Sequence, residues 1–304
     1  MKLDVLGFGA LNLDKLYRVD KIAVAGEETF VKGLTISPGG SAANTIVGLT
    51  RLGINTGYIG KIANDSEGKY ILNDLRNEKV NVRGINISKK GRSGVCIGFV
   101  DDFGERSLYI DPGVNDNLTY KEINQNYVES SKFVHLTSFV GNIPFRAQKS
   151  LVRNFETEIT MDPGELYARK GINKIKSILK KTYVFLPNEN EIKILTNKNY
   201  KIGAKELIKL GINIIAVKLG RRGCYVTNGK EDFLIPSLKK KARDSTGAGD
   251  AFCSGFIYGL LQEWELALTL RFASAVAALK CTQLGGRTGI PNLEGVESFL
   301  NTHN

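Results

Sequence analysis

A glycine-rich turn that runs into an apolar helix carries the clearest chemical pattern in this chain. The segment Asp244-Ser-Thr-Gly-Ala-Gly-Asp250 is followed at once by the apolar run 251–261. The free backbone N–H groups and the positive dipole end at such a helix start attract the oxygens of a phosphate. Gly247 and Gly249 also let the backbone approach an anion closely, because neither carries a Cβ atom. We therefore predict a phosphate site at Gly247, Ala248 and Gly249.

Asp250 adds a negative charge beside this phosphate site. A carboxylate repels a bound phosphate, but it can take the proton of a hydroxyl group that attacks the phosphorus atom. The alternative is an aspartate that only caps its helix, which is the usual role of a lone aspartate at a helix start. The three small residues before Asp250 favour phosphoryl transfer, with Asp250 as the general base.

Three further segments accompany the turn: Pro38-Gly-Gly-Ser-Ala-Ala-Asn44, Pro187-Asn-Glu-Asn-Glu191 and Val217-Lys-Leu-Gly-Arg-Arg-Gly223. Together, in this order, the four motifs resemble those of the ribokinase family, the PfkB-type carbohydrate and nucleoside kinases. The resemblance extends from about Gly7 to Pro291, and four ordered motifs are far more specific than one. It implies an α/β fold over residues 1–304, a three-layer αβα sandwich with a mostly parallel central sheet and a small β-sheet lid.

The sugar side of the site is expected where the first strand ends. Ligands of parallel α/β sheets bind beyond the carboxyl ends of the strands, and Asn12 and Asp14 follow the first predicted strand. The family places a sugar-binding aspartate there, so the resemblance assigns Asp14 to sugar hydroxyls; the alternative is a turn aspartate that binds its own backbone. Gly39 and Gly40 would offer backbone N–H groups to the same sugar, and Asn44 a donor and an acceptor.

The nucleotide side is expected at the other two motifs. Asn188 and Glu191 lie one helical turn apart and share a face, so near a polyphosphate they could orient water around Mg²⁺. A helix cap formed by the same two residues is the alternative, and both roles can hold together. Gly220 and Gly223 would allow close approach of the nucleotide, and Lys218 could reach a phosphate group.

The segment with Asp244 and Thr246 resembles the family's loop for a monovalent cation such as K⁺. Gly289, in the segment Gly285-Gly-Arg-Thr-Gly-Ile-Pro291, offers no side-chain ligand, which argues against activation by K⁺.

Strands and helices alternate along the rest of the chain, as in a parallel sheet covered on both sides. We expect strands at 2–8, 56–59, 133–136, 157–161, 183–186 and 214–219, and helices at 40–52, 67–78, 144–155, 171–180, 189–196, 204–210, 250–262 and 265–279. Two segments, about 15–36 and 93–111, break the alternation and form the predicted lid, the second as a hairpin with its turn at 101–104. Both faces of the strand 95–100 are apolar, so we expect a homodimer in which lid packs on lid.

Composition sets further bounds. The 304 residues include 42% hydrophobic and 24% charged residues, which are ordinary globular values. No apolar run is long enough for a membrane span. Four separated cysteines favour reduced thiols in a cytoplasmic protein, and His135 and His303 are too few for a histidine-based zinc site.

The formal charge of +11 raises the question of nucleic-acid binding. Most basic residues are dispersed along helices, as on solvated faces. The dense run Lys239–Lys241 with Arg243 either raises the potential near the phosphate loop or is an exposed strand end. With no nucleic-acid-binding motif present, nucleic acid is not the expected partner.

The sequence thus predicts an Mg²⁺- and ATP-dependent kinase that phosphorylates a primary hydroxyl of a sugar or sugar phosphate. A nucleoside kinase is the first alternative, and a catalytically silent sugar sensor on the same fold is a remote one. ADP or GTP as the donor stays open. The chain lacks the G-x-x-x-x-G-K-[ST] motif of P-loop kinases and the third glycine of a dinucleotide fingerprint.

Overall fold

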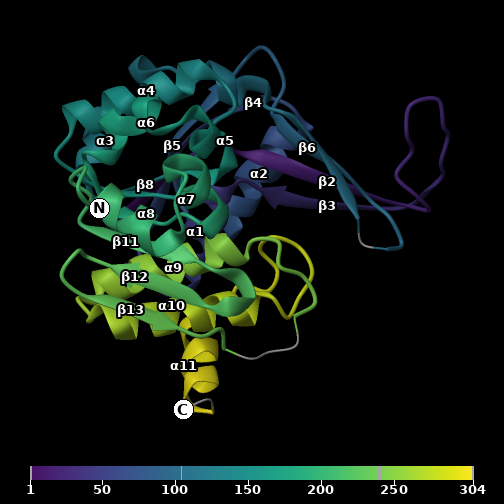
Figure 1. The fold of residues 1–304 in the computed structure, drawn as a ribbon. Helices are drawn as coiled ribbons and strands as arrows, with labels where there is room; N and C mark the ends of the chain where they lie inside the picture. The colour runs from purple at the N-terminus through teal and green to yellow at the C-terminus, as the bar shows by residue number, and fades with distance from the viewer. Residues whose placement is uncertain (1, 104, 239–241, 303–304) are drawn as a thin grey trace.

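A twisted, mostly parallel β-sheet forms the centre of the molecule, seen in a computed structural model that describes residues 2–103, 105–238 and 242–302 (Figure 1). Within these residues the strand order is β13-β12-β11-β10-β9-β8-β1-β4-β5, and only the pairs β11–β12 and β12–β13 are antiparallel. The strands are β1 Leu3–Phe8, β4 Thr56–Ala63, β5 Asn81–Ser88, β8 Ser131–Leu136, β9 Glu158–Met161, β10 Thr182–Phe185, β11 Ile214–Lys218, β12 Cys224–Thr227 and β13 Asp232–Ile235.

Helices cover both faces of this sheet, so the predicted three-layer αβα sandwich is confirmed. One hydrophobic core joins the sheet to α1 Ser41–Arg51, α2 Ser66–Asn77, α9 Ala248–Leu261, α10 Leu266–Lys280 and α11 Leu293–Asn301. A second core lies on the other face, with α3 Gln125–Glu129, α4 Asn142–Asn154, α5 Gly164–Lys170, α6 Ile172–Leu179, α7 Glu189–Thr196 and α8 Tyr200–Ile208. Strand β1 serves both cores, because Val5 faces the first and Leu6 the second.

Helix α9 positions the most important segment of the sequence. It packs between α1 and α10, and its residues 251–259 are all buried. A helix that is apolar all round is stable only in such a buried place. The glycine-rich turn is therefore fixed to the molecule by the helix that follows it.

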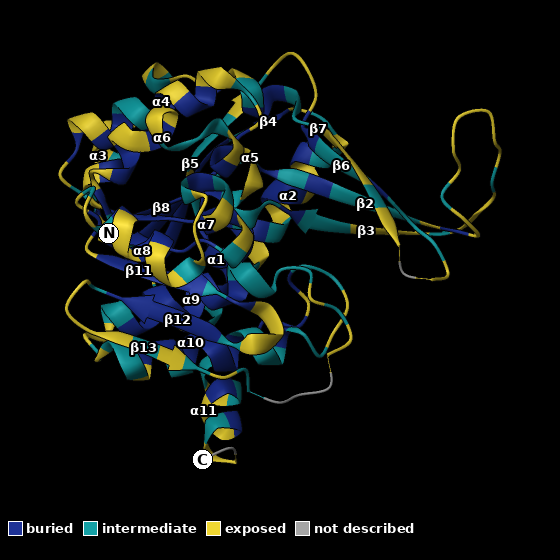
Figure 2. Ribbon diagram, viewed as in Figure 1, coloured by how far each residue is buried: buried dark blue, intermediate teal, exposed yellow. Residues whose placement is uncertain are grey.

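A second, smaller sheet projects from the body at the place of the predicted lid, and the name lid is kept for it below (Figure 1). Its order is β3-β2-β6-β7, with β2 Asn12–Val19, β3 Val31–Gly39, β6 Gly94–Val100 and β7 Arg106–Asp111. The predicted hairpin is present as the antiparallel pair β6–β7, although Gly104 of its turn lies outside the described residues, as does the run 239–241. Strand β2 begins at Asn12 and β3 ends at Gly39, so the lid strands extend beyond the predicted segment 15–36. Figure 2 shows that much of the lid surface is exposed.

Some elements differ from the predictions. The helix expected over 204–210 spans Tyr200–Ile208, because the side chain of Asn199 accepts a hydrogen bond from Ile202 N and starts the helix earlier. Strands β5, β12 and β13 and helices α3, α5 and α11 were not predicted. Within the described ranges, no helix combines the length and apolar character needed to cross a membrane. Three short 3₁₀ segments, η1 Gly113–Asn117, η2 Tyr120–Glu122 and η3 Gly220–Arg222, complete the elements of the part of the chain that the structure describes.

Candidate active site

The glycine-rich turn forms the entry to α9. Gly247 has a φ of 77°, and a Cβ atom there would lie 2.2 Å from the carbonyl oxygen of Gly286. Only glycine fits this position, because both its backbone conformation and the close approach exclude a side chain. Ala248 and Gly249 open the first turn of α9, which also contains Asp250. The predicted phosphate-binding amides and the predicted base thus occupy one helix start.

Asp250 binds the first turn of α1. Its carboxylate accepts hydrogen bonds from Ser41 Oγ at 2.6 Å and Asn44 Nδ2 at 2.7 Å. Burial raises the pKa of Asp250, and these two hydrogen bonds oppose that shift. The glycine-rich turn and the glycine pair 39–40 therefore meet at one place, although they are some 200 residues apart.

Arg287 lies behind this contact and was not predicted as a site residue. Its Nε donates to Asn44 Oδ1 at 2.7 Å, and its Nη2 donates to the Gly39 carbonyl at 3.1 Å. The Arg287 side chain is 6% exposed, and its guanidinium also pairs with Asp74. Because Arg287 uses the oxygen of the Asn44 amide, it turns the Asn44 nitrogen toward Asp250.

Asp14 lies on strand β2 beside the same segment. A Cβ atom on Gly39 would lie 2.4 Å from Asp14 Oδ2, so the absence of a side chain at Gly39 makes room for this carboxylate. Burial raises the pKa of Asp14 to about 6; Arg287 opposes the shift and Asp250 adds to it. Both carboxylates and the guanidinium therefore act on one another within a single site.

The neighbours Asn12 and Gly40 have clear structural partners. Asn12 Oδ1 accepts a hydrogen bond from Asn115 Nδ2 at 3.1 Å, and the Asn115 side chain also binds the backbone of Leu11. Gly40 has a φ of 99°, and a Cβ atom there would lie 2.3 Å from the Ala10 carbonyl. Gly40 thus permits the tight turn from the lid into α1.

On the nucleotide side, Asn188 and Glu191 form the N-terminal cap of α7. Asn188 Oδ1 accepts from Glu191 N, while Glu191 accepts from both Asn188 N and Asn188 Nδ2, each at 2.8 Å. The capping role that the sequence left open is therefore present. Burial and the nearby Asp162 carboxylate raise the pKa of Glu191 to about 7.

Lys218 lies beneath the glycine-rich turn. Its Nζ binds Asp162 Oδ2 at 2.5 Å, and a Cβ atom on Gly249 would lie 3.5 Å from that Nζ. Burial lowers the pKa of Lys218, but the attraction of Asp162 acts in the opposite direction and the pKa is raised overall. The Lys218 side chain therefore stays protonated. Asp162 was not predicted, yet it directly follows the predicted strand 157–161, where a strand-end carboxylate could have been noticed.

Of the remaining predicted residues, Gly223 and Gly220 differ in why a glycine suits each position. Gly223 is needed by the fold, because a Cβ atom there would lie 2.0 Å from the Ile235 carbonyl. Gly220 has a φ of 59° and open space where a Cβ would stand, so a ligand can approach its backbone. Thr246 N donates to Asp244 Oδ1 at 2.8 Å, which places both residues in the turn before Gly247.

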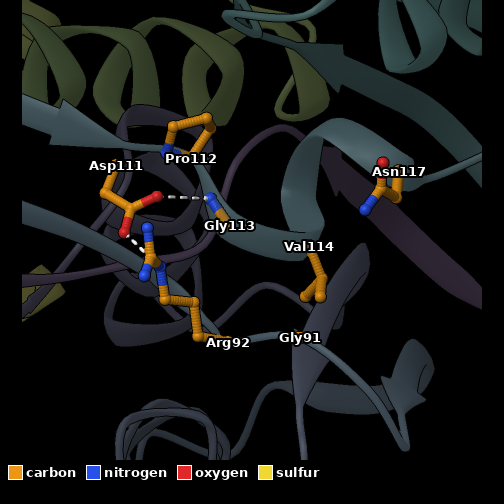
Figure 3. A pocket seen from close by; sticks show the side chains of 7 residues that line it. All are labelled: Gly91, Arg92, Asp111, Pro112, Gly113, Val114 and Asn117. Carbon is orange, nitrogen blue, oxygen red and sulfur yellow. Dashed lines mark hydrogen bonds and ion pairs between the residues drawn. The ribbon is translucent and has the colours of Figure 1, made fainter.

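A separate hollow of about 470 Å³ lies at the base of the lid (Figure 3). Its charged lining residues, Arg92 and Asp111, pair with each other at 2.5 Å, and Asp111 also accepts from Gly113 N. None of the residues of the site described above lines it. The candidate active site is therefore the cluster around Asp14 and Asp250.

Comparison with known protein families identifies the family of this chain. The model of the pfkB family carbohydrate kinases matches residues 2–293. The chain belongs to this family. It is accordingly a phosphotransferase that acts on alcohol groups. The family membership that the sequence motifs predicted is confirmed.

Individual relatives agree with the family. This pfkB family kinase is 40% identical to an uncharacterized sugar kinase of Archaeoglobus fulgidus, over 81% of this chain and 98% of that protein. It is 30% identical to the ATP-dependent ribose-1-phosphate kinase of Halopiger xanaduensis, over 97% of each chain. The crystal structure of ribokinase from Thermotoga maritima superposes with a TM-score of 0.90 at 27% identity, covering 98% of this chain and 99% of that one.

Proposed function

We propose that this pfkB family kinase transfers the terminal phosphate of ATP, with Mg²⁺, to a primary hydroxyl of a ribose-type sugar or its phosphate. One observation carries the proposal: Asp250, directly after the phosphate-binding turn, is hydrogen bonded to Asn44, while Asp14 shares its electrostatic environment. A carboxylate for the attacking hydroxyl and another for the remaining hydroxyls are thus within one site.

Each residue has a role in this proposal. The amides of Gly247, Ala248 and Gly249 bind the transferring phosphate, and Asp250 takes the proton from the attacking hydroxyl. Asp14 accepts hydrogen bonds from other sugar hydroxyls. For Asp250 to take this proton, the attacking hydroxyl must replace Ser41 or Asn44 as the partner of its carboxylate. The partial exposure of Asp250 allows this exchange.

The nucleotide would lie along Lys218, Gly220 and the turn before α9. The Lys218 ammonium supports this position of the nucleotide, because it lies next to Gly249 and stays protonated. Asn188 and Glu191 fit a hydrated Mg²⁺, which keeps several waters and needs few direct protein ligands. Bound with the nucleotide, Mg²⁺ would neutralise charge on the phosphate oxygens.

A substrate that already carries a phosphate has specific support. The Halopiger relative is a ribose-1-phosphate kinase. The strand register places Arg106 on the same lid face as Asp14, and its guanidinium lowers the pKa of the neighbouring Cys96, which burial raises to about 11. Lys32, another cation of the small sheet, already pairs with Asp20 and Asp102. We therefore assign the substrate phosphate to Arg106.

The test is phosphoryl transfer from Mg·ATP and Mg·ADP to a panel of ribose, ribose 1-phosphate, hexoses, hexose phosphates and nucleosides. We expect ribose 1-phosphate or ribose as the best acceptor, and a loss of about 10² to 10⁴-fold in kcat for Asp250→Asn with nucleotide binding retained. Arg106→Gln should raise KM for the sugar phosphate and leave KM for the free sugar unchanged. Transfer to nucleosides alone would favour a nucleoside kinase, and normal turnover of Asp250→Asn would exclude its role as base.

We also propose that the kinase is a homodimer through its lid and acts in the cytoplasm. Exposed apolar side chains lie on both faces of the lid sheet, namely Leu34, Ile36, Leu108, Tyr109 and Ile110. All four cysteines are free thiols, as expected in a reducing compartment.

A further inference from the structure

A buried ammonium group lies where the glycine-rich turn meets the loop after α10. Lys280 is the last residue of α10, and its side chain has no exposed surface. Its Nζ donates to the carbonyl oxygens of Asp244, at 3.2 Å, and Gln283, at 3.3 Å, and lies 4.0 Å from Asp244 Oδ2. A buried lysine is rare without such partners, because the desolvation of a charge is costly.

These contacts join the two segments that build the phosphate site. Besides facing Lys280, the Asp244 carboxylate accepts hydrogen bonds from Thr246 N at 2.8 Å and Gly285 N at 2.7 Å. The next residue of that second loop, Gly286, faces Gly247 closely. Lys280 therefore holds together the turn that presents the phosphate-binding amides and the loop that carries Arg287.

The charge of Lys280 also acts within the active site. Burial lowers the pKa of Lys280, whereas Asp244 and Asp250 both oppose that shift. The ammonium and the proposed base thus attract each other across the turn.

The family resemblance leads one to expect a monovalent cation near Asp244 and Thr246, but the residues present do not fit one. The carbonyl oxygen of Asp244 is bonded to Lys280, and its carboxylate oxygens are bonded to two amides. Gly289 has no side-chain oxygen, and a Cβ atom there would lie 2.4 Å from the Lys280 carbonyl. An additional cation would have to displace the ammonium or lie against it.

We infer that the Lys280 ammonium takes the place of a monovalent cation, so that this kinase holds its phosphate-binding turn in position without K⁺. Lys280 is a positioning residue in this inference, which rests on the proposed role of residues 247–250. A displacement of about 1 Å at a catalytic turn can reduce turnover about 10²-fold.

Two substitutions of Lys280 separate its charge from its volume. Lys280→Ala leaves a space lined by the oxygens of Asp244 and Gln283, whereas Lys280→Met fills that space without a charge. We expect wild-type turnover to be equal in KCl, NH₄Cl, NaCl and choline chloride of matched ionic strength. Both variants should lose about 10²-fold in kcat in choline chloride, and KCl or NH₄Cl should restore Lys280→Ala but not Lys280→Met.

Thermal unfolding tests the same inference without any substrate. KCl or NH₄Cl should raise the Tm of Lys280→Ala relative to choline chloride, because a cation that binds only the folded state stabilises it. Neither salt should act in this way on the wild type or on Lys280→Met. Activation of the wild type by K⁺, or a Lys280→Ala variant whose Tm and turnover ignore K⁺ and NH₄⁺, would overturn the inference. If the wild type transfers phosphate to no acceptor, the proposed function fails, and the Tm comparison alone still decides the role of Lys280.

Discussion

Asp14, the proposed sugar-binding carboxylate, illustrates at the scale of one residue how such a group can cost stability. Its pKa is raised to about 6, above the ordinary value of about 3.9, mainly because the carboxylate is buried. Between these values the folded chain keeps the proton that the unfolded chain releases. The stability that Asp14 contributes is therefore present below about pH 4 and is lost as the pH rises through about 6.

Asp14→Asn should consequently stabilise the protein while it harms function. At pH 8 we expect a gain on the order of 2 kcal/mol in the free energy of unfolding, because the uncharged amide avoids the desolvation of a carboxylate. At pH 4 the gain should vanish. Urea unfolding at both pH values measures it, and the KM for the sugar should rise at the same time. If the variant is as stable as the wild type at pH 8 and its KM is unchanged, the Asp14 carboxylate is neither destabilised by burial nor used to bind the sugar.

The residues that the sequence revealed differ in kind from those it did not. Asn44 and Asp250 stand in motifs and Asp14 follows the first predicted strand, so all three could be named before the structure was known. Arg287 stands in a glycine-rich loop without a periodic pattern, and its importance comes from Asn44 and Gly39, far away in the chain. A single sequence does not contain such long-range hydrogen bonds.

At the scale of elements, the cap of α7 allows a test of the proposed Mg²⁺ site. Asn188→Ala removes the acceptor for Glu191 N and the hydrogen bond from Asn188 Nδ2 to the Glu191 carboxylate, which should cost about 1 kcal/mol of stability. If the pair also orients water around Mg²⁺, the Mg²⁺ concentration for half-maximal rate should rise.

Asn199→Ala is the matched control, because Asn199 caps the adjacent helix α8 through one equivalent hydrogen bond, at 3.0 Å. It should lose similar stability in urea unfolding and keep the wild-type dependence on Mg²⁺. The same Mg²⁺ dependence in both variants would limit Asn188 to its capping role.

Element prediction succeeded where a strand or helix is buried and apolar, as for β1 and α9, because burial dictates their composition. It failed for the two antiparallel strands at one end of the sheet: β13 at the edge, and its neighbour β12, although all four residues of β12 are buried. The burial of β13 alternates between exposed and half-buried, so none of its apolar residues Phe233–Ile235 is fully buried. Strand β5 at the opposite edge is also only half-buried. Edge strands owe their structure to hydrogen bonds with a neighbour more than to their own pattern.

At the scale of the whole molecule, the lid is too thin to bury its own apolar side chains. The register places Leu108 and Ile110 on the Asp14 face, and Leu34 and Tyr109 on the opposite face. Tyr109 and Leu108 are 62% and 47% exposed. Exposed apolar side chains gathered on one small sheet mark an interaction site, and an isolated sheet edge invites pairing with another copy.

We therefore expect the wild-type kinase to sediment as a dimer at low micromolar concentration and the double variant Leu34→Glu/Leu108→Glu to sediment as a monomer. Charges on both faces of the lid would have to be desolvated in any lid-to-lid contact. The control is Leu166→Glu/Leu268→Glu, whose leucines are 40% and 48% exposed on helices α5 and α10 rather than on the lid. That control should remain a dimer, because it adds the same two negative charges to the surface but places them away from the lid. A wild-type monomer, or a dimer that survives both lid charges, would place the function of the exposed lid surface within a single chain.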